Sequence, residues 1–161
     1  MASLRVLVAG LTTLGLTAAL AACAPSSGSG DGGYESAIAA VVLAESDAGG
    51  RAFEVETEGG AFQVRVAVGG REVEVEVSGS TVTDRRESGD LDADDRAALD
   101  SASTSLADAI RIAAAAHDGG RGVEEVALDR ANDPAAWKVE FVDDGEVDVA
   151  VTDGAIVRTE G

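Results

Sequence analysis

The sequence predicts an α+β fold made of two tandem repeats, each a helix followed by an antiparallel β-meander. Three observations support this prediction. The spacing of apolar residues changes from helical to alternating twice along the chain, glycine pairs separate the segments, and the second half repeats the order of the first. We expect the two repeats to pack together, because a unit of about 50–60 residues buries a modest fraction of its surface and is marginal alone.

The first repeat is expected over residues 34–84. Apolar residues follow helical spacing after Tyr34, and Gly49-Gly50 ends this segment, as glycine does past the end of a helix. Alternation with a period of two then predicts strands joined by turns at Gly59-Gly60 and Gly69-Gly70. The expected helical stripe is Ile38, Val41, Val42 and Glu45, and the alternating apolar positions are Phe53, Val55, Phe62, Val64, Val66, Val68, Val73, Val75 and Val77.

The second repeat is expected over residues 103–161. Ser105 and Asp108 fit a capping box at the start of a helix, and Gly119-Gly120 is expected to end it. Turns are predicted at residues 132–134 and at Asp144-Gly145, which is a strong hairpin signal. The expected helical stripe is Leu106, Ile110, Ala113 and Ala114, and the alternating positions are Val126, Leu128, Trp137, Val139, Phe141, Val147, Val149 and Val151.

Residues 85–102 between the repeats are interpreted as a short acidic helical linker. Asp92 is placed to cap a helix, with Asp94 in its first turn, where negative charge is favourable. Asp90, Asp92 and Asp94 also have the spacing that opens a calcium loop, but Asp95 stands where glycine is needed and Ser101 where glutamate is needed. These three aspartates are therefore weak metal candidates, capping is the favoured interpretation, and no cofactor is expected.

The helix-and-meander unit resembles the PepSY domain, and the whole chain resembles a tandem PepSY lipoprotein. The resemblance rests on Ala37-Ile38 and Ala109-Ile110 in the helices, on the Gly-Gly breaks, on the aromatic residues Phe62 and Trp137 that open the middle strands, and on the closing segments 77–82 and 151–156. PepSY units occur in metalloprotease propeptides and in cell-envelope proteins. The resemblance therefore implies restraint or modulation of a protease more than catalysis.

The N-terminus is predicted to be a lipoprotein signal peptide over residues 1–22. Arg5 is followed by an apolar run that ends at Leu20-Ala21-Ala22-Cys23, which resembles a bacterial lipobox. The Cys23 thiol would carry the lipid, and residues 23–33 would form the lipidated cysteine and a flexible Gly/Ser tether. A retained N-terminal anchor and a free Cys23 thiol remain as alternatives. The lipid anchor predicts a location at the cell membrane, on its extracytoplasmic side.

Charge and composition exclude several classes of function. The 161 residues carry 12 Lys+Arg against 30 Asp+Glu, and this net charge of -18 argues against a nucleic-acid partner. One Cys and one His do not supply a usual structural zinc site. His117 falls on the last turn of the second helix, where a structural interaction with the helix end is expected, and no nucleophile pattern accompanies it. We therefore expect no enzymatic activity.

Acidic residues alternate with valines in the predicted strands. Glu72, Glu74 and Glu76 are expected on one face of a strand, as are Glu54 and Glu56. One interpretation is a solvated face that keeps the domain soluble. The other is a docking face that attracts a basic partner and steers its approach.

Together these features predict a non-enzymatic, membrane-anchored cell-envelope lipoprotein that acts as a protein-interaction module. The expected partners are the membrane, through the lipid anchor, and an envelope protein such as a protease or a receptor ectodomain. The alternative function is an extracytoplasmic ligand or calcium sensor. A purely structural envelope protein is a third interpretation.

Overall fold

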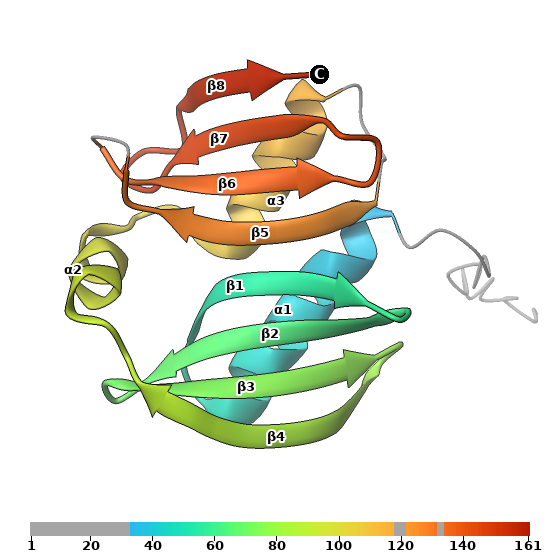
Figure 1. Ribbon diagram of the computed structural model, residues 1–161, viewed down its shortest axis with the longest axis vertical. Coiled ribbons are helices and arrows are strands. Elements are labelled where there is room, and N and C mark those ends of the chain that lie inside the picture. Colours follow the sequence, from blue (N-terminus) through green and yellow to red (C-terminus); the bar gives the residue numbers. More distant parts are fainter. Residues whose placement is uncertain (1–32, 118–121, 132–133) are drawn as a thin grey trace, which may run out of the picture.

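Eight antiparallel strands form one sheet, and two helices cover one face of it (Figure 1). The computed structural model describes residues 33–117, 122–131 and 134–161. The strand order is β4-β3-β2-β1-β5-β6-β7-β8, which confirms the α+β class. The elements are α1 (Tyr34–Ala48), β1 (Arg51–Glu58), β2 (Ala61–Val68), β3 (Arg71–Ser78), β4 (Thr81–Asp90), α2 (Ala93–Ser101), α3 (Leu106–Ala116), β5 (Val123–Asp129), β6 (Ala136–Phe141), β7 (Glu146–Ala150) and β8 (Ile156–Glu160).

The two halves of the chain meet at the first strand of each half. β1 pairs antiparallel with β5 through Glu54–Ala127, Val55–Val126 and Glu56–Glu125, and we call this pairing the seam. Behind the sheet α1 contacts α3, so both layers continue from one half to the other. From the seam outward, each half runs through its strands in chain order to an exposed edge strand, β4 or β8.

The predicted helix ends agree with the structure where it describes them. Gly49 adopts a left-handed conformation with φ 74°, and its N–H donates to the carbonyl of Glu45. Asp92 caps α2 by accepting from the Asp94 N–H at 2.8 Å, and Ser105 caps α3 by accepting from the Asp108 N–H at 3.1 Å. The turns expected at Gly119-Gly120 and at Asn132-Asp133 lie outside the described residues.

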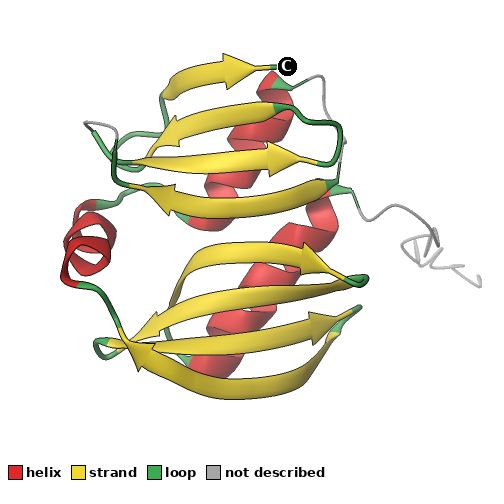
Figure 2. Cartoon of the chain, in the orientation of Figure 1, coloured by secondary structure: helices red, strands yellow, loops and turns green. Residues whose placement is uncertain are grey.

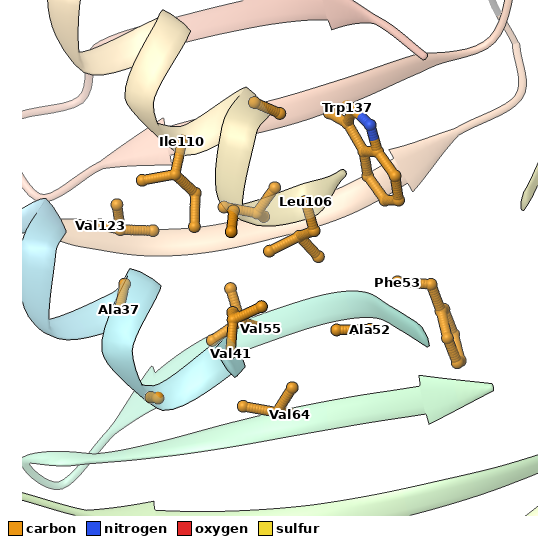
Figure 3. Packing of buried hydrophobic residues seen from close by; sticks show 14 of the residues in the cluster. Ala37, Val41, Ala52, Phe53, Val55, Val64, Leu106, Ile110, Val123 and Trp137 are labelled. Carbon is orange, nitrogen blue, oxygen red and sulfur yellow. The ribbon is translucent and has the colours of Figure 1, made fainter. Parts of the chain in front are cut away.

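The core lies between the helices and the sheet and continues across the seam (Figure 3). The predicted stripe of α3 is confirmed, because all of its members are buried. The predicted stripe of α1 is wrong in part. Val42 is 51% exposed, and Ile38 is only partly buried, because small residues bring this helix close to the sheet and to α3. The buried positions of α1 are Ala37, Ala40, Val41, Ala44 and Ala48.

β4 is longer than the sequence predicts and runs to Asp90, so residues 85–90 form part of the sheet. The strand is held by polar interactions. The alternation of apolar residues in the sequence does not reveal such interactions. Arg71 of β3 pairs with Glu87 and with Asp90, and Arg85 donates to the carbonyl of Asp47 at the C-terminal end of α1. A cation at this helix end is favourable, because the exposed carbonyls there carry partial negative charge.

The linker helix α2 lies beside the sheet, where the first half connects to the second (Figure 2). Arg51 at the start of β1 donates to the carbonyls of Leu99, Ala102 and Thr104 at 2.7, 3.0 and 3.2 Å. Arg130 at the end of β5 pairs with the side chain of Asp92. Two arginines from the two halves therefore hold the linker helix in place.

Candidate functional site

The face of the sheet opposite the helices is covered by no element in the described part of the chain (Figure 1). On this open face the cross-strand register aligns one residue from each strand. We call this line the acidic row, because every member except Gln63 is a carboxylate and neighbouring strands lie about 4.8 Å apart. From β4 to β8 its members are Asp84, Glu76, Gln63, Glu56, Glu125, Glu140, Glu146 and Glu160.

A second line of residues runs beside the acidic row and is charged with both signs. We call it the mixed row. Its cations form ion pairs with carboxylates at the two ends of the acidic row. On β5, next to the seam, its member is an alanine. From β4 to β8 its members are Arg86, Glu74, Arg65, Glu54, Ala127, Lys138, Asp148 and Arg158.

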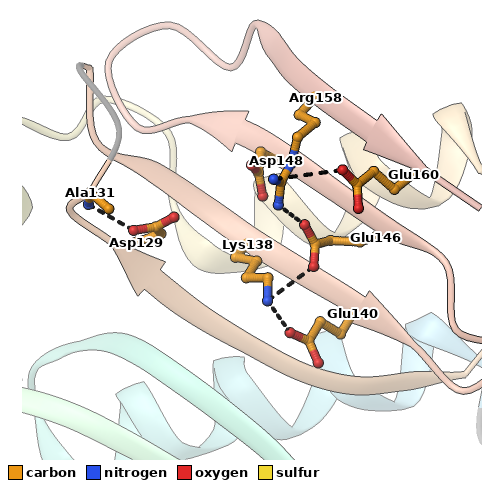
Figure 4. Close-up of polar contacts among 8 residues, drawn as sticks. All are labelled: Asp129, Ala131, Lys138, Glu140, Glu146, Asp148, Arg158 and Glu160. Atoms are coloured by element: carbon orange, nitrogen blue, oxygen red, sulfur yellow. Dashed lines mark hydrogen bonds and ion pairs between the residues drawn. The ribbon is translucent and has the colours of Figure 1, made fainter.

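The pairing at the β8 end is dense (Figure 4). Lys138 bonds to Glu140 and, at 2.9 Å, to Glu146, and these hydrogen bonds raise the pKa of the lysine. Burial opposes a charge on Glu146, but the hydrogen bonds from Lys138 and Arg158 outweigh it and lower the pKa of this carboxyl. Arg158 also pairs with Asp148 at 3.2 Å. At this end of the open face two cations therefore offset part of the charge of the four carboxylates.

The carboxylates at the seam are not neutralised in this way. Within the described ranges, neither Glu56 nor Glu125 makes an ion pair, although they face each other across β1 and β5. Burial raises the pKa of Glu125, and the negative charges of Glu140 and Glu56 raise it further. Burial likewise raises the pKa of Glu54, against the opposing effect of Arg65. Two facing carboxylates without a cation partner among the described residues therefore lie at the seam.

A small depression of about 140 Å³ lies on the open face next to the seam. Glu54, Glu56 and Gln63 contribute to its lining. The Gln63 side chain donates through Nε2 to Glu76 at 3.1 Å, whereas its Oε1 atom is buried and accepts no hydrogen bond from the described residues. Arg65 and Arg86 also line the depression, so it holds guanidinium groups as well as carboxylates.

The three glutamates predicted from the sequence lie on this open face, along β3. Glu74 pairs with Arg86, and Glu76 accepts from Gln63 and, at 2.6 Å, from the Thr83 hydroxyl. Glu74 and Glu76 therefore have hydrogen-bonding side-chain partners that Glu56 and Glu125 lack, whereas the Glu72 side chain makes no ion pair among the described residues. Sequence reasoning placed Glu56 on an acidic strand face, but it missed Glu125 and Glu140, because only the β1–β5 pairing brings them beside it.

The candidate metal ligands have separate partners. Asp90 pairs with Arg71 at 2.7 Å, Asp92 caps α2, and Asp94 donates its backbone N–H to that cap. The cap and the nearby Arg130 keep the pKa of Asp92 low. Among the described residues, no group of three or more His, Cys, Asp or Glu side chains is arranged to hold a metal ion.

His117 follows α3 and packs against the β6–β7 hairpin. Its ring stacks on Phe141 with centroids 4.7 Å apart, and its Nε2 lies 3.1 Å from Asp143. A Cβ atom on Gly145 would lie 2.3 Å from the imidazole, so a residue without a side chain is required there. The imidazole of His117 therefore contacts the hairpin, and not the end of its own helix as the sequence predicts.

Cys23 lies outside the described residues, as does the rest of the predicted signal peptide and tether. None of the helices that the structure describes has both the length and the apolar character needed to span a membrane.

The sequence profile of the PepSY family, described as the peptidase propeptide and YPEB domain, matches residues 105–160. These residues form α3 and β5–β8. No curated protein matches the chain. A crystal structure from Clostridium difficile 630, described as a candidate lipoprotein, is 18% identical with a TM-score of 0.43; the match covers 75% of this chain and 89% of the other. Residues 105–160, in the second half of the fold, are therefore similar to a PepSY domain.

Proposed function

We propose that the protein is a non-enzymatic cell-envelope lipoprotein that binds a basic protein partner through the open face of its sheet. The observation that carries this proposal is the acidic row, with its un-neutralised carboxylates at the seam. The PepSY match favours a secreted or membrane protease as the first candidate partner, because the family description includes peptidase propeptides. The expected effect is restraint or modulation of that protease.

The first half is proposed to be a second PepSY-like unit. Its order of one helix and four antiparallel strands is the same as that of α3 and β5–β8. The pairing of β1 with β5 then has a functional consequence. It doubles the width of the open face and brings the carboxylates of the two halves together at the seam.

The lipid anchor is proposed to hold this face near the outer surface of the membrane. Cys23 is separated from the start of α1 by a Gly/Ser-rich segment, and such segments behave as flexible tethers. A tether lets the folded part rotate toward a partner, and confinement to the membrane raises the effective concentration of each for the other.

The chemistry of the open face specifies the partner's contact surface. Bringing lysine or arginine side chains to Glu56 and Glu125 would relieve the repulsion between these carboxylates. A net charge of -18 would steer a basic partner during approach, so we expect the association rate to fall steeply with rising salt concentration.

Capture from intact cells tests this proposal with matched variants. The anchored protein is cross-linked reversibly and purified, and its partners are identified for the wild type and for the Glu56→Gln, Glu125→Gln, Glu140→Gln triple variant. The control replaces three exposed helix carboxylates, as Glu35→Gln, Asp94→Asn and Asp100→Asn. We expect one basic partner with the wild type and the control, and its loss in the first triple variant. Equal capture of the same partner by both triple variants would contradict the proposal.

A further inference from the structure

Two cations differ from all the others in the described part of the chain. Every other described Arg and Lys side chain makes an ion pair with a carboxylate, but Arg51 and Arg96 make none. Arg96 is exposed on α2, and the only hydrogen bond of its side chain to a described residue is a long one of 3.4 Å to the carbonyl of Gly70. In so acidic a protein, two cations without carboxylate partners are unexpected.

Both of these arginines line the same cavity. It has a volume of about 440 Å³ and lies between α2, the start of β1 and the turn between β2 and β3. This volume falls within the range of about 300–1,000 Å³ that is usual for small-molecule sites. Leu91 and Leu99, which are 7% and 5% exposed, provide apolar lining, and Asp100 is also part of the wall.

The local backbone keeps the guanidinium groups available to a ligand. Arg51 uses three N–H groups on carbonyls, which leaves two of the five guanidinium N–H groups without an acceptor among the described residues. Arg96 lies against Gly70, where a Cβ atom would be 2.8 Å from its Nη2 atom. The glycine therefore leaves the space that this guanidinium occupies at the cavity.

We infer that this cavity binds a free α-amino acid with an apolar side chain. The two guanidinium groups would receive the α-carboxylate, because arginine matches the planar geometry of that group. The carboxylate of Asp100 would hold the α-ammonium group, and the two leucines would contact the apolar side chain. No member of the acidic row lines this cavity, so the inference does not depend on the proposed partner surface.

NMR titration of the full chain in detergent micelles tests this inference, with L-leucine as the probe. The amide signals of Gly69 and Gly70 report on the cavity. We expect saturable shifts with a dissociation constant of about 1 mM, since the ligand is small and gains few contacts. L-leucinamide, which lacks the carboxylate, should bind about tenfold more weakly, because charge-assisted hydrogen bonds to arginine are lost.

Two variants distinguish the ends of the ligand. Arg96→Gln should weaken L-leucine binding about tenfold, whereas the control Arg111→Gln, on α3 and paired with Asp108, should not. Asp100→Asn should weaken binding of L-leucine but not of 4-methylpentanoate, which lacks the ammonium group. The absence of saturable shifts with L-leucine, equal binding of L-leucinamide, or equal effects of the two arginine variants would overturn the inference.

Discussion

Glu56 of β1 lies directly opposite Glu125 of β5 in the ladder that joins the two halves of the sheet. Like charges in facing positions destabilise a sheet. At this position the fold therefore carries an electrostatic cost. Apolar pairing of Val55 with Val126 on the helix-covered face of the same two strands offsets it, because both side chains are fully buried.

Glu125→Gln is expected to stabilise the protein at pH 7 by about 0.5 kcal/mol, because it removes the repulsion with Glu56 and Glu140. The pKa of Glu125 is raised in the folded state, so the charged carboxyl costs stability above this pKa, and the cost disappears as the pH falls through it. The gain should therefore shrink as the pH falls through this raised pKa. Urea unfolding at pH 7 and at acid pH measures it, with exposed Glu124→Gln as the control. A constant gain at all pH values would contradict the electrostatic cause.

Val55→Ala is expected to cost about 2 kcal/mol in the free energy of unfolding, because the side chain is fully buried where the two halves meet. Val42→Ala should change it by less than about 0.5 kcal/mol, since that side chain is half exposed on α1. Chemical unfolding of both variants compares these positions. Similar losses of unfolding free energy for the two variants would contradict the placement of Val42 on the exposed side of α1.

Arg51→Ala is expected to destabilise the fold by about 2 kcal/mol, because three carbonyls around the linker helix lose their donor. Arg71→Ala removes an exposed ion-paired arginine of β3 and should cost less than Arg51→Ala, because solvent screens exposed ion pairs. Thermal unfolding of both variants measures the difference. An equal and small loss would mean that Arg51 does not hold α2.

Cys23→Ser is expected to release the protein from the membrane, because it removes the thiol that is proposed to accept the lipid. Cell fractionation should find the wild type with membranes and the variant in the soluble or secreted fraction. Mass spectrometry of the wild type should show an N-terminal, lipid-modified Cys23. An unmodified Cys23 or a retained Met1 would refute the lipobox.

Local features of the fold are visible in the sequence because neighbouring residues determine them. The Gly59-Gly60 and Gly69-Gly70 turns require positive φ angles, which range here from 56° to 86° and which glycine adopts readily. Asp92 and Ser105 mark helix starts because their side chains accept from nearby N–H groups.

Features that depend on distant contacts are not visible in the sequence. Nothing near Val55 or Val126 indicates that β1 pairs with β5, yet this pairing creates the acidic row. The polar sequence of β4 contains few apolar positions, and only its partners on β3 and α1 explain its length. The candidate site could therefore be predicted as an acidic strand face, but not as a row that crosses both halves.

The most direct test of the proposed function maps contact sites in intact cells with a zero-length carbodiimide, which joins carboxylates to lysine amines. Lys138, the single lysine of the chain, lies beside Glu140 and Glu146 and supplies an internal control link. The account predicts links from Glu56 and Glu125 to lysines of one partner protein. Partner links confined to the helix carboxylates, such as Glu35 and Asp94, would contradict it.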